Sequence, residues 1–63
     1  MDKNATKSLL FIDHENKRIS EQVEVCMRLK NIPGVNAKRA LYEIQESAKN
    51  ILDEIAQILE GEK

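Results

Sequence analysis

One turn signal divides this chain of 63 residues into two halves. Residues 31–34 read NIPG, and no other proline occurs in the sequence. Proline presets a negative φ and glycine accepts a positive one, so Pro33 and Gly34 fit the central positions of a type II turn. We therefore expect a single domain, residues 1–63, whose two halves are joined by a turn over 31–35.

The second half carries apolar residues at the spacing of an amphipathic helix. They recur at alternating steps of four and three residues, at Ala37, Leu41, Ile44, Ala48, Ile51, Ile55 and Ile58. This repeat lasts for three heptads, and Ala40, Leu52 and Leu59 widen it to one side, which indicates more than one neighbouring helix. Asn36 is a favoured N-cap and Gly61 a C-terminal stop, so the pattern predicts a helix over 36–60.

The first half is also helical in pattern, but its start is ambiguous. Helical spacing is kept by Ile19, Val23, Cys26 and Leu29. A polar run at 13–18 interrupts the stripe upstream. Either one helix runs over about 8–30 with a solvated middle, or Asp13 caps a helix over 13–30 and residues 1–12 form a separate N-terminal segment, such as a short extra helix. We adopt the second interpretation because Asp is a strong N-cap.

A short connection between two helices makes them antiparallel neighbours, so the fold class is all-α, an antiparallel helical hairpin. A core this small needs a further source of stability. Cys26 is the only cysteine, which excludes an intrachain disulfide, so we expect a homo-oligomeric helix bundle, as a four-helix dimer or a ring of hairpins. The expected core and oligomer contacts are Ile19, Val23, Leu41, Ile44, Ala48, Ile51, Ile55 and Ile58.

The residues predict neither catalysis nor a cofactor. His14 has no nucleophile or acid placed to work with it, and Cys26 lies on an apolar stripe. His14 and Cys26 are too few for a closed metal site, and no phosphate-binding or dinucleotide motif is present. The apolar run 9–12 is too short for a signal peptide or a membrane span. A lone free cysteine suits a reducing compartment, so we expect a cytoplasmic protein, in its own cell or a host cell.

Positive charge gathers around the predicted turn. Residues 25–42 carry four bases and no acid, a sum of +4, whereas residues 43–63 sum to −4. Lys38 and Arg39 fall in the first turn of the second helix, where the helix dipole disfavours cations. Cations beside free helix N–H groups can bind an anion. The candidate ligand- or anion-binding residues are Arg28, Lys38, Arg39 and Tyr42.

The stretch from Pro33 through AKRALYEIQESAKNILDEIAQ resembles the second helix of the hairpin domain in phage anti-CBASS and anti-Thoeris sponge proteins. The matching positions are Pro33, Arg39, Ala40, Leu41, Ile44, Glu46 and Ser47, and Phe11, His14, Gln22 and Arg28 echo the first helix. The resemblance covers about residues 11–57, with Asn50 where the family often has an aromatic residue. It implies a ring of hairpins with cyclic nucleotides held at subunit interfaces.

Two functions fit these observations. The first is a phage-type sponge that sequesters a phosphate-bearing cyclic nucleotide immune signal. The alternative is a small regulatory or adaptor protein that docks on another protein, such as a host protein, through a helix face. A net charge of −1 and only two aromatic residues do not favour RNA or DNA as the partner.

Overall fold

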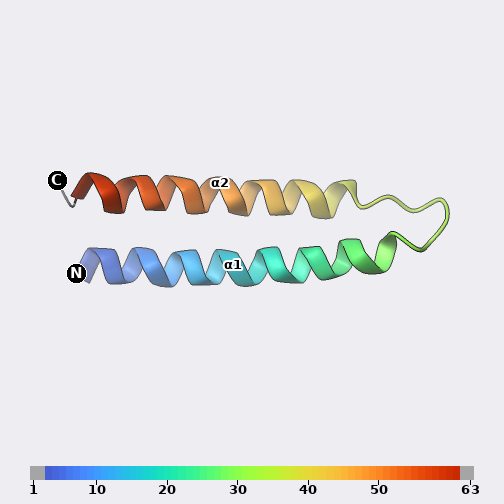
Figure 1. Cartoon of the computed structure of the whole chain (residues 1–63), viewed down its shortest axis with the longest axis horizontal. Helices are drawn as coiled ribbons and strands as arrows, with labels where there is room; N and C mark the ends of the chain where they lie inside the picture. Colours follow the sequence, from blue (N-terminus) through green and yellow to red (C-terminus); the bar gives the residue numbers. More distant parts are fainter. Residues whose placement is uncertain (1–2, 62–63) are drawn as a thin grey trace.

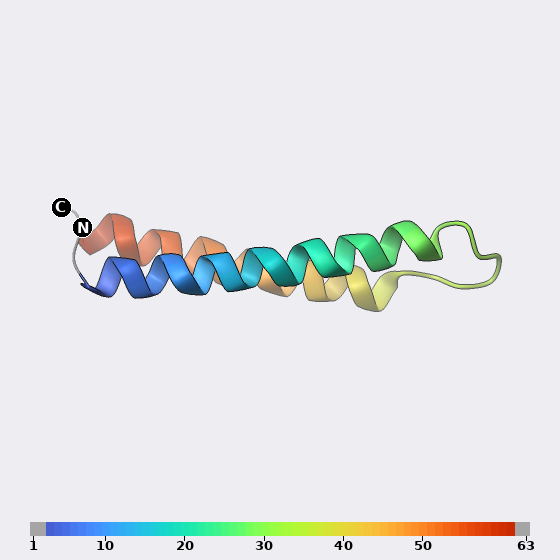
Figure 2. The same ribbon diagram turned by 90° about the horizontal axis from the view of Figure 1, so that it is seen from below.

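The computed structural model describes residues 3–61, which form two long α-helices. Helix α1 spans Lys3–Leu29 and helix α2 spans Lys38–Gly61. The helices run antiparallel, side by side in Figure 1 and one behind the other in Figure 2, so the first turn of α1 and the last turn of α2 lie at the same end. The prediction of an all-α helical hairpin is confirmed. The molecule is a rod of 50 × 14 × 10 Å.

Helix α1 is continuous, so the break that we expected at Asp13 is wrong. The alternative of one unbroken helix is correct, and this helix begins upstream of residue 8, at Lys3. The polar run holds helical geometry because its charges pair along the helix. The Lys17 ammonium lies 3.1 Å from the Asp13 carboxylate, one turn away. Polarity in this run therefore reflects solvent exposure of most of its residues and not a helix boundary.

The turn has the predicted geometry. The Val35 N–H donates to the Ile32 carbonyl at 3.3 Å, which closes a four-residue turn around Pro33 and Gly34. Gly34 has a φ of 79°, as the third residue of a type II turn requires. Proline and glycine thus reverse the chain at the position that the sequence indicated.

Helix α2 begins with the predicted cap. The Asn36 side-chain oxygen accepts a hydrogen bond from the Lys38 N–H at 3.1 Å. The Leu41 N–H donates to the Ala37 carbonyl at 2.9 Å, the first turn of regular helix after that cap. Asn36 therefore acts as the N-cap. The helix ends at Gly61, the last residue described.

The two helices meet along one stripe on each, which we call the seam. On α1 the seam comprises Ala5, Ser8, Ile12, Glu15, Ile19, Gln22, Cys26 and Leu29, and on α2 it comprises Ala37, Ala40, Ile44, Ser47, Ile51, Glu54 and Ile58, all buried or half-buried. Ser8 and Ile58 line one hollow between the helices, and Leu29 and Ala37 line another. This antiparallel register places Glu15 at the height of Ile51 along the rod.

The seam makes a thin core. Among the described residues only Ala5, Glu15, Ala40 and Ser47 are buried, and none of them has a large apolar side chain. The accessible surface is 5220 Å², whereas a compact chain of 7.2 kDa exposes about 4,100 Å². The radius of gyration is 15.0 Å, against about 11 Å for a compact domain of this length. A single hairpin therefore leaves about 1,100 Å² more surface exposed than a compact fold does.

Part of the expected core lies outside the seam. Val23, Leu41 and Ile55 are exposed in the hairpin, and Ala48 is half-buried beside the seam. Ile19, Ile44, Ile51 and Ile58 do lie in the seam, half-buried. Helix α2 is turned slightly from the expected orientation, so that Ala40, Ser47 and Glu54 face α1 in place of Leu41, Ala48 and Ile55. Small residues at the contact let two helices approach closely, and the larger aliphatic side chains then point to one flank.

Candidate binding surfaces

The four candidate anion-binding residues lie at the turn end of the rod but do not form one site. The Lys38 ammonium lies 5.9 Å from the centroid of the Tyr42 ring, one turn away on α2. Arg28 instead pairs with Glu24 on its own helix at 3.5 Å. Lys38 and Tyr42 are thus brought together, whereas Arg28 is engaged elsewhere.

Arg39 borders a hollow of about 410 Å³ near the turn. Its lining residues are Gln22, Val25, Leu29, Asn36, Ala37, Arg39, Ala40 and Glu43. The hollow contains one cation and one carboxylate, so it has no excess of positive charge to attract an anion. The Lys38 N–H, which an anion at the helix N-terminus would need, already donates to Asn36. The single hairpin therefore does not build the predicted anion site from these residues.

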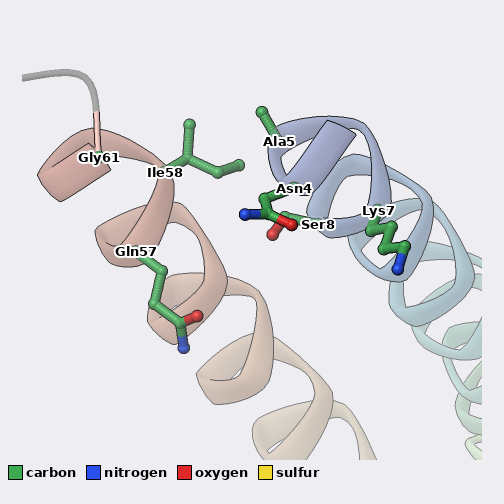
Figure 3. Close-up of a pocket in the computed structure, with 7 residues that line it drawn as sticks. All are labelled: Asn4, Ala5, Lys7, Ser8, Gln57, Ile58 and Gly61. Carbon is green, nitrogen blue, oxygen red and sulfur yellow. The ribbon is translucent and has the colours of Figure 1, made fainter. Parts of the chain in front are cut away.

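A second hollow, of about 450 Å³, opens at the far end of the rod. Asn4, Ala5 and Ser8 from the first turns of α1 lie opposite Gln57 and Ile58 from the last turns of α2 (Figure 3). Lys7 and Gly61 complete the lining. Amide, hydroxyl and ammonium groups are present, and none of the described residues that line it is a carboxylate or a histidine. The sequence pattern did not indicate this hollow, since none of its polar residues belongs to a recognisable motif.

One flank of the hairpin carries an ion pair across the helices, and most of its residues are polar, apart from Phe11 and Val25. Arg18 donates to the Glu43 carboxylate at 2.6 Å. Arg18 comes directly before the seam residue Ile19, and Glu43 comes directly before the seam residue Ile44. On both helices, residues directly before a seam residue therefore lie on this flank. We call this flank the polar face. The second nitrogen of the same guanidinium lies 3.6 Å from the carboxylate of Glu15.

Glu15 has a buried carboxylate that the sequence interpretation did not single out. Its side chain is 5% exposed, although it lies in a run that reads as solvated. Its Oε2 atom has no hydrogen-bond partner in the structure, and neither does the buried Oγ atom of Ser47. The burial of Glu15 could have been predicted from spacing. Positions 12, 15 and 19 keep the three- and four-residue steps of the seam, which places the Glu15 carboxylate between the helices. Both atoms lie in the seam and not in a cleft, which is typical of a structural position.

The opposite flank is apolar. Residues directly after a seam residue lie on this side of both helices, because residues directly before a seam residue lie on the polar face. Those that follow Ser8, Glu15 and Gln22 on α1 are Leu9, Asn16 and Val23, and those that follow Ala40, Ser47 and Glu54 on α2 are Leu41, Ala48 and Ile55. We call this set the apolar face. Leu52 and Leu59 border it on α2, with exposed fractions of 67% and 64%.

The remaining candidate chemistry is absent from the described part of the chain. No three His, Cys, Asp or Glu side chains among residues 3–61 are grouped so that they could hold a metal ion. His14 is exposed, and Cys26 is half-buried in the seam. Neither α1 nor α2 has a stretch long and apolar enough to cross a membrane.

No match was found for this chain among protein-family models, curated proteins or solved structures. The functional argument therefore rests on the geometry of the hairpin. On the apolar face, the fold leaves exposed aliphatic side chains of both helices without a neighbour.

Proposed function

We propose that this chain is a non-enzymatic binding protein that works as a homo-oligomeric helix bundle, with the apolar face as its contact surface. The observation that carries the proposal is the exposure of large aliphatic side chains along one flank. Leu41 is 57% exposed, and Val23 and Ile55 are also exposed. A contiguous apolar surface of this kind marks an interaction site.

The energetics of the hairpin support assembly. Fully burying one Leu or Ile side chain contributes about 1.5–3 kcal/mol. The hairpin alone buries no such side chain completely. Association through the apolar face would supply the core that the seam lacks, in a chain whose length is near the lower limit for independent folding.

Sedimentation of the wild type and two matched variants tests this proposal. Ile55→Lys places a charge on the apolar face, whereas Gln57→Lys adds the same charge two residues away, beside the polar hollow of Figure 3. At micromolar concentration we expect oligomers for the wild type and Gln57→Lys, and a smaller species for Ile55→Lys. A stably folded wild-type monomer would overturn self-association and leave the apolar face to a different protein, the adaptor function.

A second candidate function is sequestration of a phosphate-bearing cyclic nucleotide at the turn end. The observation that favours it is the pairing of Lys38 with Tyr42, a cation beside an aromatic ring that could stack on a base. Because one hairpin does not bring Arg28 and Arg39 to this pair, the proposed site requires an assembly of several hairpins, as the resemblance to sponge proteins implies. Calorimetric titration with cyclic di- and trinucleotides tests it, and no heat with any of them would rule it out.

A further inference from the structure

The hairpin carries opposite charges at its two ends. The half that contains the turn, residues 17–49, has seven Lys or Arg and four Asp or Glu, a sum of +3. The other half of the described hairpin, residues 3–16 and 50–61, has two bases and five acids, a sum of −3. Folding into a rod 50 Å long therefore converts the charge pattern of the sequence into a lengthwise charge asymmetry.

The apolar face has a polar residue at its centre. Asn16 lies between Leu9 and Val23 on α1, and the register of the seam, which levels Glu15 with Ile51, places it level with Asn50 on α2, about 3 Å along the rod from Ala48. Leu41 and Ile55 flank Ala48 at equal distances along the chain. The face is thus nearly symmetric about its midpoint, which is what a two-fold axis through that midpoint requires.

Two arrangements bring two such faces together about a two-fold axis. With the axis along the rod, the turn ends coincide, α1 covers α2 of the second copy, and Asn16 meets Ala48. With the axis across the rod, the turn end of one copy covers the open end of the other, and each helix covers its own copy. Asn16 then meets Asn16 of the second copy, and Leu41 meets Ile55.

Charge and hydrogen bonding both favour the second arrangement. It places the half with a charge of +3 over the half with a charge of −3, whereas the first arrangement opposes like charges. It also pairs two Asn16 amides, each a donor and an acceptor, whereas the first arrangement leaves this amide against a methyl group. A paired asparagine within an apolar contact is a known device for setting the register of helices.

We infer that the occupant of the apolar face is a second copy of this chain, antiparallel to the first, with the two-fold axis passing between the two Asn16 residues and between the two Ala48 residues. The product is a four-helix bundle in which every neighbouring pair of helices is antiparallel. Two chains have about 2,200 Å² of surface beyond that of compact folds, enough for a stable interface. The inference rests on the proposed self-association.

Cysteine crosslinking in a Cys26→Ser background tests the orientation. In the antiparallel dimer Ala48 faces its own copy, so Ala48→Cys should oxidise to a disulfide-linked dimer. Ala56→Cys, about two turns later on the exposed outer surface of α2, is the matched control and should remain a monomer on a non-reducing gel. In the first arrangement, with the axis along the rod and the turn ends together, Ala48 would face Asn16, and Ala48→Cys would not crosslink.

Spin labels at the turn give a second measurement that leaves the apolar face unaltered. Labels on Asn31→Cys, in the same background, should lie about 50 Å apart in the antiparallel dimer, close to the length of the rod. A distance of about 20 Å would place the turn ends together, since neighbouring helices lie 8–10 Å apart, and would overturn the orientation alone. A monomer by sedimentation would overturn the proposed self-association as well, so the two failures are distinguishable.

Discussion

The Arg18 guanidinium donates to the Glu43 carboxylate at 2.6 Å and so ties the middle of α1 to the first half of α2. The same guanidinium lies 3.6 Å from Glu15, whose carboxylate is buried. One partly exposed cation therefore serves two acids from different helices. Removal of a cation from a buried carboxylate is costly because the carboxylate has lost its hydration.

Arg18→Ala should therefore destabilise the protein by about 1–3 kcal/mol, since Glu15 and Glu43 both lose their cation. Lys17→Ala is the control, because its pair with Asp13 is exposed on both sides and should contribute under about 0.5 kcal/mol. Urea unfolding at one fixed protein concentration measures both variants. Equal losses for the two would show that the link between the helices contributes nothing beyond a surface pair.

Replacement of Glu15 should have the opposite sign. Glu15→Met keeps the length of the side chain, removes a buried charge and leaves Arg18 paired with Glu43. We expect a gain of about 1 kcal/mol in the free energy of unfolding, since apolar replacement of a buried ion is often stabilising. Glu21→Met, at an exposed position on the same helix, is the control and should change stability by less than about 0.5 kcal/mol. A loss of stability on Glu15→Met would contradict the prediction and show that the carboxylate is needed in the seam.

Ile51→Asp should abolish folding. Ile51 lies in the seam at the height of Glu15, so the variant would bury a second carboxylate beside the first, at a cost of several kcal/mol. Lys49→Ala, on the exposed outer surface of α2, should change stability by less than about 0.5 kcal/mol. Circular dichroism melting compares them, and a wild-type melting temperature for Ile51→Asp would disprove the register.

The two glycines should respond to alanine in opposite directions. Gly34 has a φ of 79° and open space where a Cβ would lie, so Gly34→Ala should cost about 1 kcal/mol from backbone strain alone. Gly61 is helical and also has open space at that point, so Gly61→Ala should gain about 0.5 kcal/mol. Thermal melts of both variants test this, and a stabilised Gly34→Ala would argue against the type II turn.

Neutralising the first turn of α2 should separate stability from binding. Cations here oppose the helix dipole, so Lys38→Gln with Arg39→Gln should raise the free energy of unfolding by about 0.3–1 kcal/mol per residue at low salt. Loss of the interaction between the Lys38 ammonium and the Tyr42 ring offsets part of this gain. If the turn end binds cyclic nucleotides, the same change should remove the heat of binding while the fold persists. Melting and calorimetric titration measure the two effects. Undiminished binding by the double variant would exclude these residues from the site.

The sequence alone determined the elements of this fold that depend on local interactions. Pro33 and Gly34 reverse the chain, Asn36 caps α2, and helical spacing defines both helices. Each of these features is decided within about four residues along the chain, by allowed backbone angles and by hydrogen bonds to neighbouring N–H groups. Arg28, Lys38 and Arg39 also lie at the turn end as the sequence indicated, because a hairpin brings the last turn of α1 beside the first turn of α2.

Only the tertiary structure decided which stripe of α2 meets α1. Helix α2 offers two adjacent stripes that differ by one residue, one with Ala40 and Ser47 and one with Leu41 and Ala48, and both keep heptad spacing. Close approach of the helices selects the stripe with the small side chains, a choice that no local pattern contains. The same packing draws Glu15 into the seam. It also turns the aliphatic side chains of α2 outward to form the apolar face.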